Sequence, residues 1–333
     1  MRLVYSSQYN ITFFGIERFH PFDSRKYGRA WALLEKELGP TLAKYHERVD
    51  RPVSEAELLM VHTQEYLDTL HSSIAIARAL EMPQLAVLPA SVLRWRILRP
   101  MRWAVRGSVL AGRCALRYGL SVNLSGGYHH AKPAHGEGFC LFSDAALMIR
   151  QLRADRQLGA TDPILYVDLD AHQGNGVCHQ FRDDPSVRIF DMYNREIYPR
   201  GDFAARERID WDVPLDFNIT GAHYLRLLRT RLPALLDESS SSERPRLAIY
   251  NAGTDPYAYD QLGGMCLSSS DIKERDLFVI DQLEARKIPV VILLSGGYSK
   301  ESFQLVAATV RALVQRCESL ADGAAGNERT ARS

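Results

Sequence analysis

Two aspartates and a histidine, Asp168, Asp170 and His172, stand at alternate positions at the end of an apolar run. In an extended strand, side chains two residues apart point to the same face, so all three face one way. A second apolar run leads to Asp255. Two carboxylates and one imidazole from these strands would form a metal site with a position open for water, as catalytic zinc sites do. A structural alternative is that the aspartates cap a helix beginning near Gly174.

A metal site of this kind needs a base and a hydrogen-bond donor from neighbouring side chains. Two carboxylates neutralise the charge of a divalent ion, so its water is less acidic than the water of an all-histidine site, whose pKa is about 7. The pair His129 and His130 can act as a base, because neutral imidazole titrates near neutral pH. Tyr298 can donate its hydroxyl to a developing oxyanion. Taken singly, the histidines could be polar loop residues and Tyr298 a residue on a glycine turn.

These residues need a sheet that brings their segments together. The predicted strands are Leu3–Ser6, Ser121–Leu124, Ile164–Asp170, Val187–Met192, Leu247–Asn251 and Val290–Ser295. The predicted helices are Lys26–Leu38, Arg102–Tyr118, Ser143–Leu158, Gly221–Leu236, Ser270–Arg286 and Glu301–Arg316. The alternation predicts an α/β fold, and strands that are apolar on both faces favour a parallel sheet covered by helices. Ligands bind beyond the carboxyl ends of such strands, where the reactive groups lie, so we expect one crevice.

The chain shows no linker or repeat that would divide it. We predict one domain over residues 1–320, with a helical and loop insertion near 40–100, and a disordered tail over 321–333. Within the insertion, the segment QLAVLPASVLRWRILRP carries two prolines and three arginines, and we expect a surface loop near the site. The run DESSSSERPR, residues 237–246, is expected to be a polar loop.

Composition excludes several classes of protein. Forty-one Lys and Arg residues against 40 Asp and Glu residues give a net charge of +1 with no block of like charges, which argues against nucleic-acid and membrane-surface binding. No apolar run is long enough to span a membrane, and the N-terminus lacks a secretory pattern. Five dispersed cysteines without a C-x-x-C pair favour reduced thiols and a cytoplasmic location. Nucleotide-binding glycine motifs, H-E-x-x-H and G-x-S-x-G are absent.

Several other residues have plainer interpretations. Cys140 could be a nucleophile near His130, but a buried small residue is the simpler alternative. The remaining histidines that we considered are predicted to be structural or surface residues: His20, His46, His62 and His71.

Seven phrases along the chain resemble the zinc-dependent histone deacetylase family, and in particular its class IV branch. They run from residue 10 to residue 302 in this order: NITFFGIERFHPFD, VHTQEYL, GGYHHAKPAHGEGFC, VDLDAHQGNG, FDMYNREIYPRGD, YNAGTDPYAYDQLGG and LLSGGYSKES. The resemblance implies a single arginase/deacetylase-type α/β domain, with an eight-stranded, mainly parallel sheet flanked by helices on both faces.

The resemblance also implies roles for individual residues. It makes His130 the general base and then the general acid, His129 mainly an electrostatic partner, and Tyr298 the group that polarises the acyl carbonyl. One zinc ion per chain would be bound by Asp170, His172 and Asp255.

Other positions match the walls of the family's substrate channel and its inner cation site. Gly138 and Phe139 correspond to the channel segment, and Tyr193 to a second wall residue. A structural monovalent cation, K⁺, would lie at Asp168, Asp170, His172, Asp191 and Met192.

Two positions depart from the family pattern. Asn175 stands where many members have an aspartate beside the second histidine, and a neutral partner should make His130 easier to deprotonate. Tyr128 stands where tryptophan is common. Asp168, the partner of His129, follows the family pattern. No residue matches the aspartate that grips the substrate backbone in some members.

We therefore predict hydrolysis of Nε-acyl-lysine amides in peptides or proteins. The class IV resemblance implies a preference for long fatty acyl groups over acetyl. The main alternative is an amidohydrolase of small acylated amines such as acetylpolyamines. A di-manganese arginase-like enzyme and a silent acyl-lysine binding protein are weaker alternatives. The same ligand set could also accept iron(II) or cobalt, and the oligomeric state is not predicted.

Overall fold

The computed structural model describes residues 1–12, 23–238 and 244–330 of the chain, and its sheet follows the predicted class. Eight strands, all paired in parallel, form one sheet in the order β2-β1-β3-β8-β7-β4-β5-β6. They are β1 (Arg2–Tyr5), β2 (His46–Arg48), β3 (Leu120–Asn123), β4 (Ile164–Asp168), β5 (Val187–Asn194), β6 (Trp211–Leu215), β7 (Leu247–Asn251) and β8 (Val290–Leu293). The expected eight-stranded parallel sheet is confirmed.

The six strands predicted from apolar runs are all present, and the two that were missed lie at the sheet edges. β2 has only three residues, which are polar or charged, and β6 contains Pro214. Proline lacks an N–H and is tolerated at an edge, so neither strand carries a clear strand pattern. The central strands β3, β4, β7 and β8 are buried at every residue, as expected when helices cover both faces.

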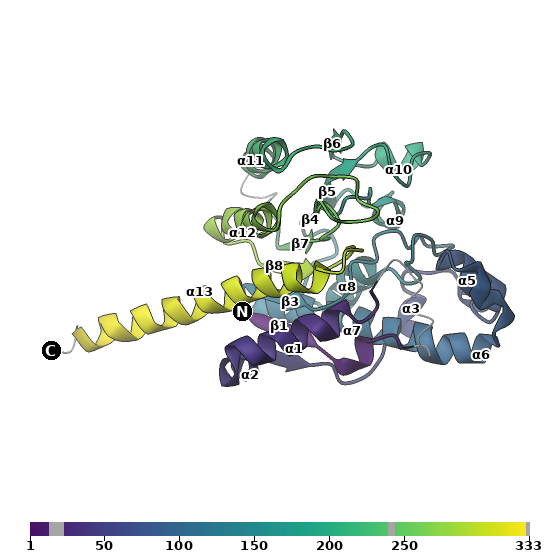
Figure 1. Ribbon diagram of the computed structural model, residues 1–333, viewed down its shortest axis with the longest axis horizontal. Helices are drawn as coiled ribbons and strands as arrows, with labels where there is room; N and C mark the ends of the chain where they lie inside the picture. Colours follow the sequence, from purple (N-terminus) through teal and green to yellow (C-terminus); the bar gives the residue numbers. More distant parts are fainter. Residues whose placement is uncertain (13–22, 239–243, 331–333) are drawn as a thin grey trace.

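Helices pack on both faces of the sheet (Figure 1). One layer holds α7 (Arg99–Tyr118), α8 (Asp144–Ala154) and α9 (Asn175–Gln180). The other holds α1 (Lys26–Leu38), α11 (Gly221–Glu238), α12 (Ser269–Ala285) and α13 (Ser302–Thr330). Shorter helical segments are η1 (Ser7–Tyr9), α2 (Pro40–Tyr45), α3 (Glu55–Leu58), α4 (Gln64–Thr69), α5 (Ser73–Ala79) and α10 (Phe203–Arg206).

The segment that we expected to be a surface loop, residues 84–100, is mostly helical. It contains η3 (Pro83–Val87), α6 (Ala90–Leu93) and a π-helical segment, η4 (Arg94–Leu98), which leads directly into α7. Pro89 precedes α6 as its N-cap, where no helical N–H is needed, and Pro100 lies in the first turn of α7, directly after the π-helical segment. Leu93, Ile97 and Met101 are buried at helical spacing, so apolar packing outweighs the local proline signal.

The C-terminal helix is longer than the predicted Glu301–Arg316, and two internal segments lie outside the described residues. α13 continues through Thr330 and projects beyond the body of the fold (Figure 1). The disorder expected for residues 321–333 stays a prediction. Most of NITFFGIERFHPFD, with His20, and residues 239–243 of the polar run lie outside the described residues. Among the helices that the structure describes, none has the length and apolar character required to cross a bilayer.

Candidate metal centre and active site

Four loops meet at the carboxyl-terminal edge of the sheet, after the neighbouring strands β3, β8, β7 and β4. Adjacent parallel strands end side by side, so their loops are necessarily close. The loop after β3 carries His129 and His130, and the loop after β4 carries Asp170 and His172. The crevice expected from the sequence therefore exists.

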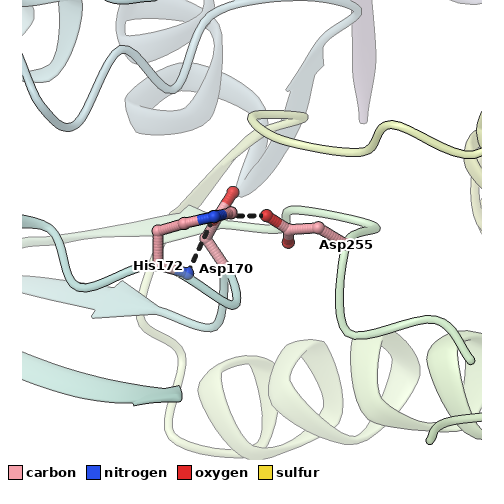
Figure 2. A group of neighbouring side chains, drawn as sticks. All are labelled: Asp170, His172 and Asp255. Atoms are coloured by element: carbon pink, nitrogen blue, oxygen red, sulfur yellow. Dashed lines mark hydrogen bonds and ion pairs between the residues drawn. The ribbon is translucent and has the colours of Figure 1, made fainter. Parts of the chain in front are cut away.

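Asp170, His172 and Asp255 form a compact buried cluster. They offer one ligand atom each, all within 4.8 Å of one another. Figure 2 shows the three side chains converging. His172 Nδ1 lies 2.9 Å from Asp255 Oδ2 and 3.1 Å from Asp170 Oδ1. Both carboxylates are completely buried, so they have no water to compensate their charge.

The two buried carboxylates of this cluster favour a bound cation. Burial, and then the neighbouring charge of Asp170, raise the pKa of Asp255 to about 7. Burial opposes protonation of His172, but hydrogen bonds to Asp170 and Asp255 outweigh it and raise the pKa of the imidazole to about 10. The three side chains thus hold a proton between them, and the same lone pairs suit a divalent ion with mixed oxygen and nitrogen ligands. The residues fit a metal of this kind.

Gly296 lies against the carboxylates of Asp170 and Asp255, which occupy the space that a side chain at this position would need. Its N–H donates to Asp170 Oδ2 at 2.9 Å. A Cβ at this position would lie 2.5 Å from Asp170 Oδ2 and from Asp255 Oδ2. The glycine turn before Tyr298 is therefore needed for close approach to the ligand set.

His129 is held by Asp168. The distance from Nδ1 to Asp168 Oδ2 is 2.8 Å, and both side chains are buried. Burial disfavours the charged imidazole, but the carboxylates of Asp168 and Asp170 outweigh it and raise the pKa of His129 to about 9. His129 is therefore suited to carrying a positive charge rather than to accepting a proton.

His130 is oriented by Asn175. The amide nitrogen of Asn175 donates to Glu137 and Asp202, at 2.6 and 3.1 Å, so its oxygen faces His130 Nδ1 at 2.8 Å. Nδ1 must then carry the proton, which leaves the lone pair on Nε2. Burial, and then the positive charges of His129 and His172, lower the pKa of His130 well below its usual value. The neutral form is thus favoured, as a general base requires.

Tyr298 stands between the cluster and the channel segment. Its ring centroid is 5.9 Å from that of His172 and 6.0 Å from that of Phe139. Its N–H donates to Asp260 Oδ2 at 2.6 Å, which fixes the turn. Burial, and then Asp170 and Asp255, raise the pKa of the phenol, so it stays protonated and can donate.

A predominantly apolar cavity leads to these residues. His129, His130, Gly138, Phe139 and Tyr298 all line it. Apolar walls are added by Leu80, Met82, Leu85, Ile97 and Met101. Pockets with mostly apolar walls and a few converging polar groups are typical of small-ligand sites.

Tyr193 does not line this cavity, in contrast to the expectation. It is buried in β5, and the guanidinium of Arg206 lies 5.7 Å from its ring centroid. The tyrosine beside His130 is Tyr198, whose ring centroid is 5.0 Å from that of the imidazole. The course of the loop after β5 decides which tyrosine approaches the site, and no local pattern encodes that course.

Cys140 also borders the cavity, but its thiol is poorly suited to attack. Burial raises the pKa of Cys140 well above its usual value. A protonated thiol is a weak nucleophile, so the structural interpretation is favoured.

Asp168 and Asp191 form a second buried acidic pair behind the cluster. They are register partners in β4 and β5, and both are fully buried. Burial, and then Asp168, raise the pKa of Asp191 well above its usual value. Asp191 Oδ1 is buried and has no hydrogen-bond partner among the described residues. Met192 follows directly in β5.

Sequence reasoning missed Lys26, a completely buried cation. Its ammonium donates to the carbonyl oxygens of Ser295 and Gly296, at 2.7 and 2.6 Å. It thereby braces the turn that carries Tyr298. A lone lysine at the start of a helix gives no sequence signal for such a long-range contact.

Comparisons with known proteins agree with this architecture. The model of the histone deacetylase domain matches residues 20–314. Histone deacetylase 2 of Arabidopsis thaliana is 39% identical over 315 residues, which cover 93% of this chain and 78% of that protein. Histone deacetylase B of Dictyostelium discoideum is 24% identical, and the match covers 77% of this chain but only 60% of that protein. The crystal structure of the HDA15 HD domain superposes with a TM-score of 0.71 at 20% identity, covering 95% of this chain and 91% of that one.

Proposed function

We propose, since the chain belongs to the histone deacetylase family, that this hydrolase cleaves Nε-acyl-lysine amides with the help of one divalent metal ion. The observation that carries the proposal is the buried cluster of Asp170, His172 and Asp255, adjacent to a base and a phenol donor. The products are a carboxylate and the free lysine amine, with one water consumed.

The proposed metal is zinc, held by one carboxylate oxygen each of Asp170 and Asp255 and by His172 Nδ1. When bound, such an ion supplies Lewis-acid polarisation of the acyl carbonyl and a more acidic water. Iron(II) and cobalt suit the same ligands.

Three side chains of the site have separate roles in the reaction. His130 Nε2 accepts a proton from the attacking water and then donates one to the departing lysine nitrogen. His129, charged through its contact with Asp168, stabilises negative charge that develops nearby. Tyr298 donates its hydroxyl hydrogen to the carbonyl oxygen as that oxygen becomes an oxyanion.

The apolar cavity supports a preference for long acyl chains and, with the sequence resemblance, a class IV assignment. Leu80, Met82 and Leu85 offer no hydrogen-bonding side chain to an acetyl group, but they can bury methylenes of a fatty acyl chain. Each buried methylene contributes about 0.8 kcal/mol. Specificity for lysine, rather than for a small acylated amine, is part of the same proposal.

The test is a peptide series from acetyl-lysine to myristoyl-lysine, with acetylspermidine as a separate substrate. We expect kcat/KM to rise with chain length and to fall for the long chains in Met82→Trp, which fills the cavity. Faster turnover of acetylspermidine than of every acyl peptide would overturn the lysine assignment. A flat series would overturn the acyl preference alone.

The acidic pair behind the cluster is proposed to hold a structural K⁺ together with Asp170, His172 and Met192. The unpartnered oxygen of Asp191 supports this assignment. A cytoplasmic location is also proposed, because all five cysteines are free thiols.

A further inference from the structure

A second cavity, of about 380 Å³, lies in the helical insertion away from the metal-ligand cluster. Its cationic lining comes from η4 and α7, in Arg94, Arg99 and Arg102, and from His71 after α4. One acidic residue, Glu55, also lines it. Three arginines against one carboxylate give the cavity a net positive charge.

The carboxylates near this cavity, Glu55 and Glu57, interact with Arg102 from beyond ion-pair distance. Among the residues that the structure describes, none of the three forms an ion pair. Arg94 donates instead to His71 Nδ1 at 3.1 Å, which requires a lone pair on that nitrogen. Arg102 Nε is buried without a hydrogen-bond partner in the described part of the chain.

Apart from Ser91, the rest of the cavity wall is apolar. Leu58, Leu67, Leu70 and Leu98 line it, together with Phe142. The indole of Trp95, 55% exposed, stands among the lining residues. The cavity volume and its mixture of apolar walls with a few charged groups match small-molecule sites rather than a flat protein interface.

The π-helical segment η4 and the start of α7 form a wall of both cavities. Single π turns inside helices are rare and occur frequently at functional sites. Ile97 and Met101 line the active-site cavity, whereas Arg94, Leu98 and Arg102 line the second one. The same stretch of helix therefore forms a wall of each.

We propose that the second cavity binds a small amphipathic anion, with a carboxylate or phosphate head held by Arg94, Arg99 and Arg102 and an apolar tail against the leucines. Arginine suits both head groups because its planar guanidinium forms paired hydrogen bonds with their oxygens. This site is independent of the proposed deacylase chemistry.

The test is calorimetric titration of the full chain with four probes at concentrations below micelle formation. They are octyl phosphate, octanoate, inorganic phosphate and uncharged octyl glucoside. We expect one octyl phosphate or octanoate per chain, and weaker binding as salt increases. Binding of only one of the two supports the site and identifies its head group. Equal binding of octyl glucoside would overturn the proposal, because the charge of the head group would then be irrelevant. Equal binding of inorganic phosphate would also overturn it, because the apolar tail would then be irrelevant.

Variants locate the binding. The double substitution Arg94→Gln with Arg99→Gln, on exposed positions, should weaken binding at least tenfold, and Arg102→Lys should weaken it less than Arg102→Met. The double substitution Arg150→Gln with Arg226→Gln, on exposed positions of α8 and α11, is the charge-matched control and should bind as the native chain does. Asp255→Asn, which disrupts the metal-ligand cluster, should also leave binding intact. If Asp255→Asn lost binding and Arg94→Gln with Arg99→Gln did not, the ligand would be bound in the active site, and the proposal would be overturned.

Discussion

The side-chain amide of Asn175 fixes the imidazole of His130, since its oxygen lies 2.8 Å from Nδ1 while its nitrogen donates to two carboxylates. A neutral amide gives the imidazolium no counter-charge. The pKa of His130 therefore stays low, and the lone pair on Nε2 is available over a wide range of pH.

Asn175→Asp should move the acidic limb of the kcat/KM profile upward by about one to three pH units, because a carboxylate beside His130 favours the charged form. At pH 6 a smaller fraction of His130 is then neutral, so activity there falls most. A pH–rate profile measures the shift. A limb that stays in place would mean that His130 is not the titrating base. A melting curve should accompany the profile, because the new carboxylate also faces Glu137 and Asp202.

Tyr298→Phe should lower kcat by about 10²-fold or more, the usual cost of removing one oxyanion donor. The fold should be unaffected, because the backbone N–H of residue 298 still donates to Asp260. Steady-state kinetics on an acyl-lysine peptide provide the measurement. Tyr259→Phe, at a position 76% exposed, is the matched control. Turnover at the native rate in Tyr298→Phe would remove this phenol from the mechanism.

Gly296→Ala should weaken metal binding by about 10- to 100-fold, the typical effect of disturbing groups that support metal ligands. The new Cβ would displace the carboxylates of Asp170 and Asp255. Metal content after dialysis against a graded chelator reports the change. Gly201→Ala, where a Cβ meets nothing within 4 Å, should retain metal as the native chain does. Equal retention in both variants would contradict the close approach.

Lys26→Met should reduce the free energy of unfolding by about 1–3 kcal/mol, because two buried carbonyl groups lose their charged donor. It should also lower kcat, since the turn that carries Tyr298 is no longer braced. Urea denaturation and kinetics measure the two effects. Lys26→Arg retains a donor and should recover part of both. Native stability together with native turnover in Lys26→Met would show that the contact is dispensable.

The sequence predicted the centre of the fold better than its periphery. β3, β4, β7 and β8 are buried on both faces and therefore appear as short apolar runs. β2 and β6 depend on pairing with a neighbour at an edge, which leaves no apolar pattern. The helices over residues 84–100 were missed because their prolines occupy permissive first-turn positions.

Some residues of the candidate site could likewise be predicted from the sequence, and others could not. Asp170, His172, His129 and His130 could be found because they closely follow apolar strands whose carboxyl ends meet at one edge of the sheet. Lys26 reaches the site from a distant helix, and Tyr198 reaches it through the path of an irregular loop. Neither contact follows from spacing along the chain. Tyr193, predicted from resemblance, belongs to a buried strand instead.

The central claim is that Asp170, His172 and Asp255 bind one divalent ion on which hydrolysis depends. The direct measurement is metal content by mass spectrometry alongside acyl-lysine hydrolysis, for the purified chain, after chelation and after addition of zinc. We predict about one equivalent per chain, loss of activity on chelation and its recovery with zinc. Undiminished hydrolysis by the metal-free chain would contradict the account.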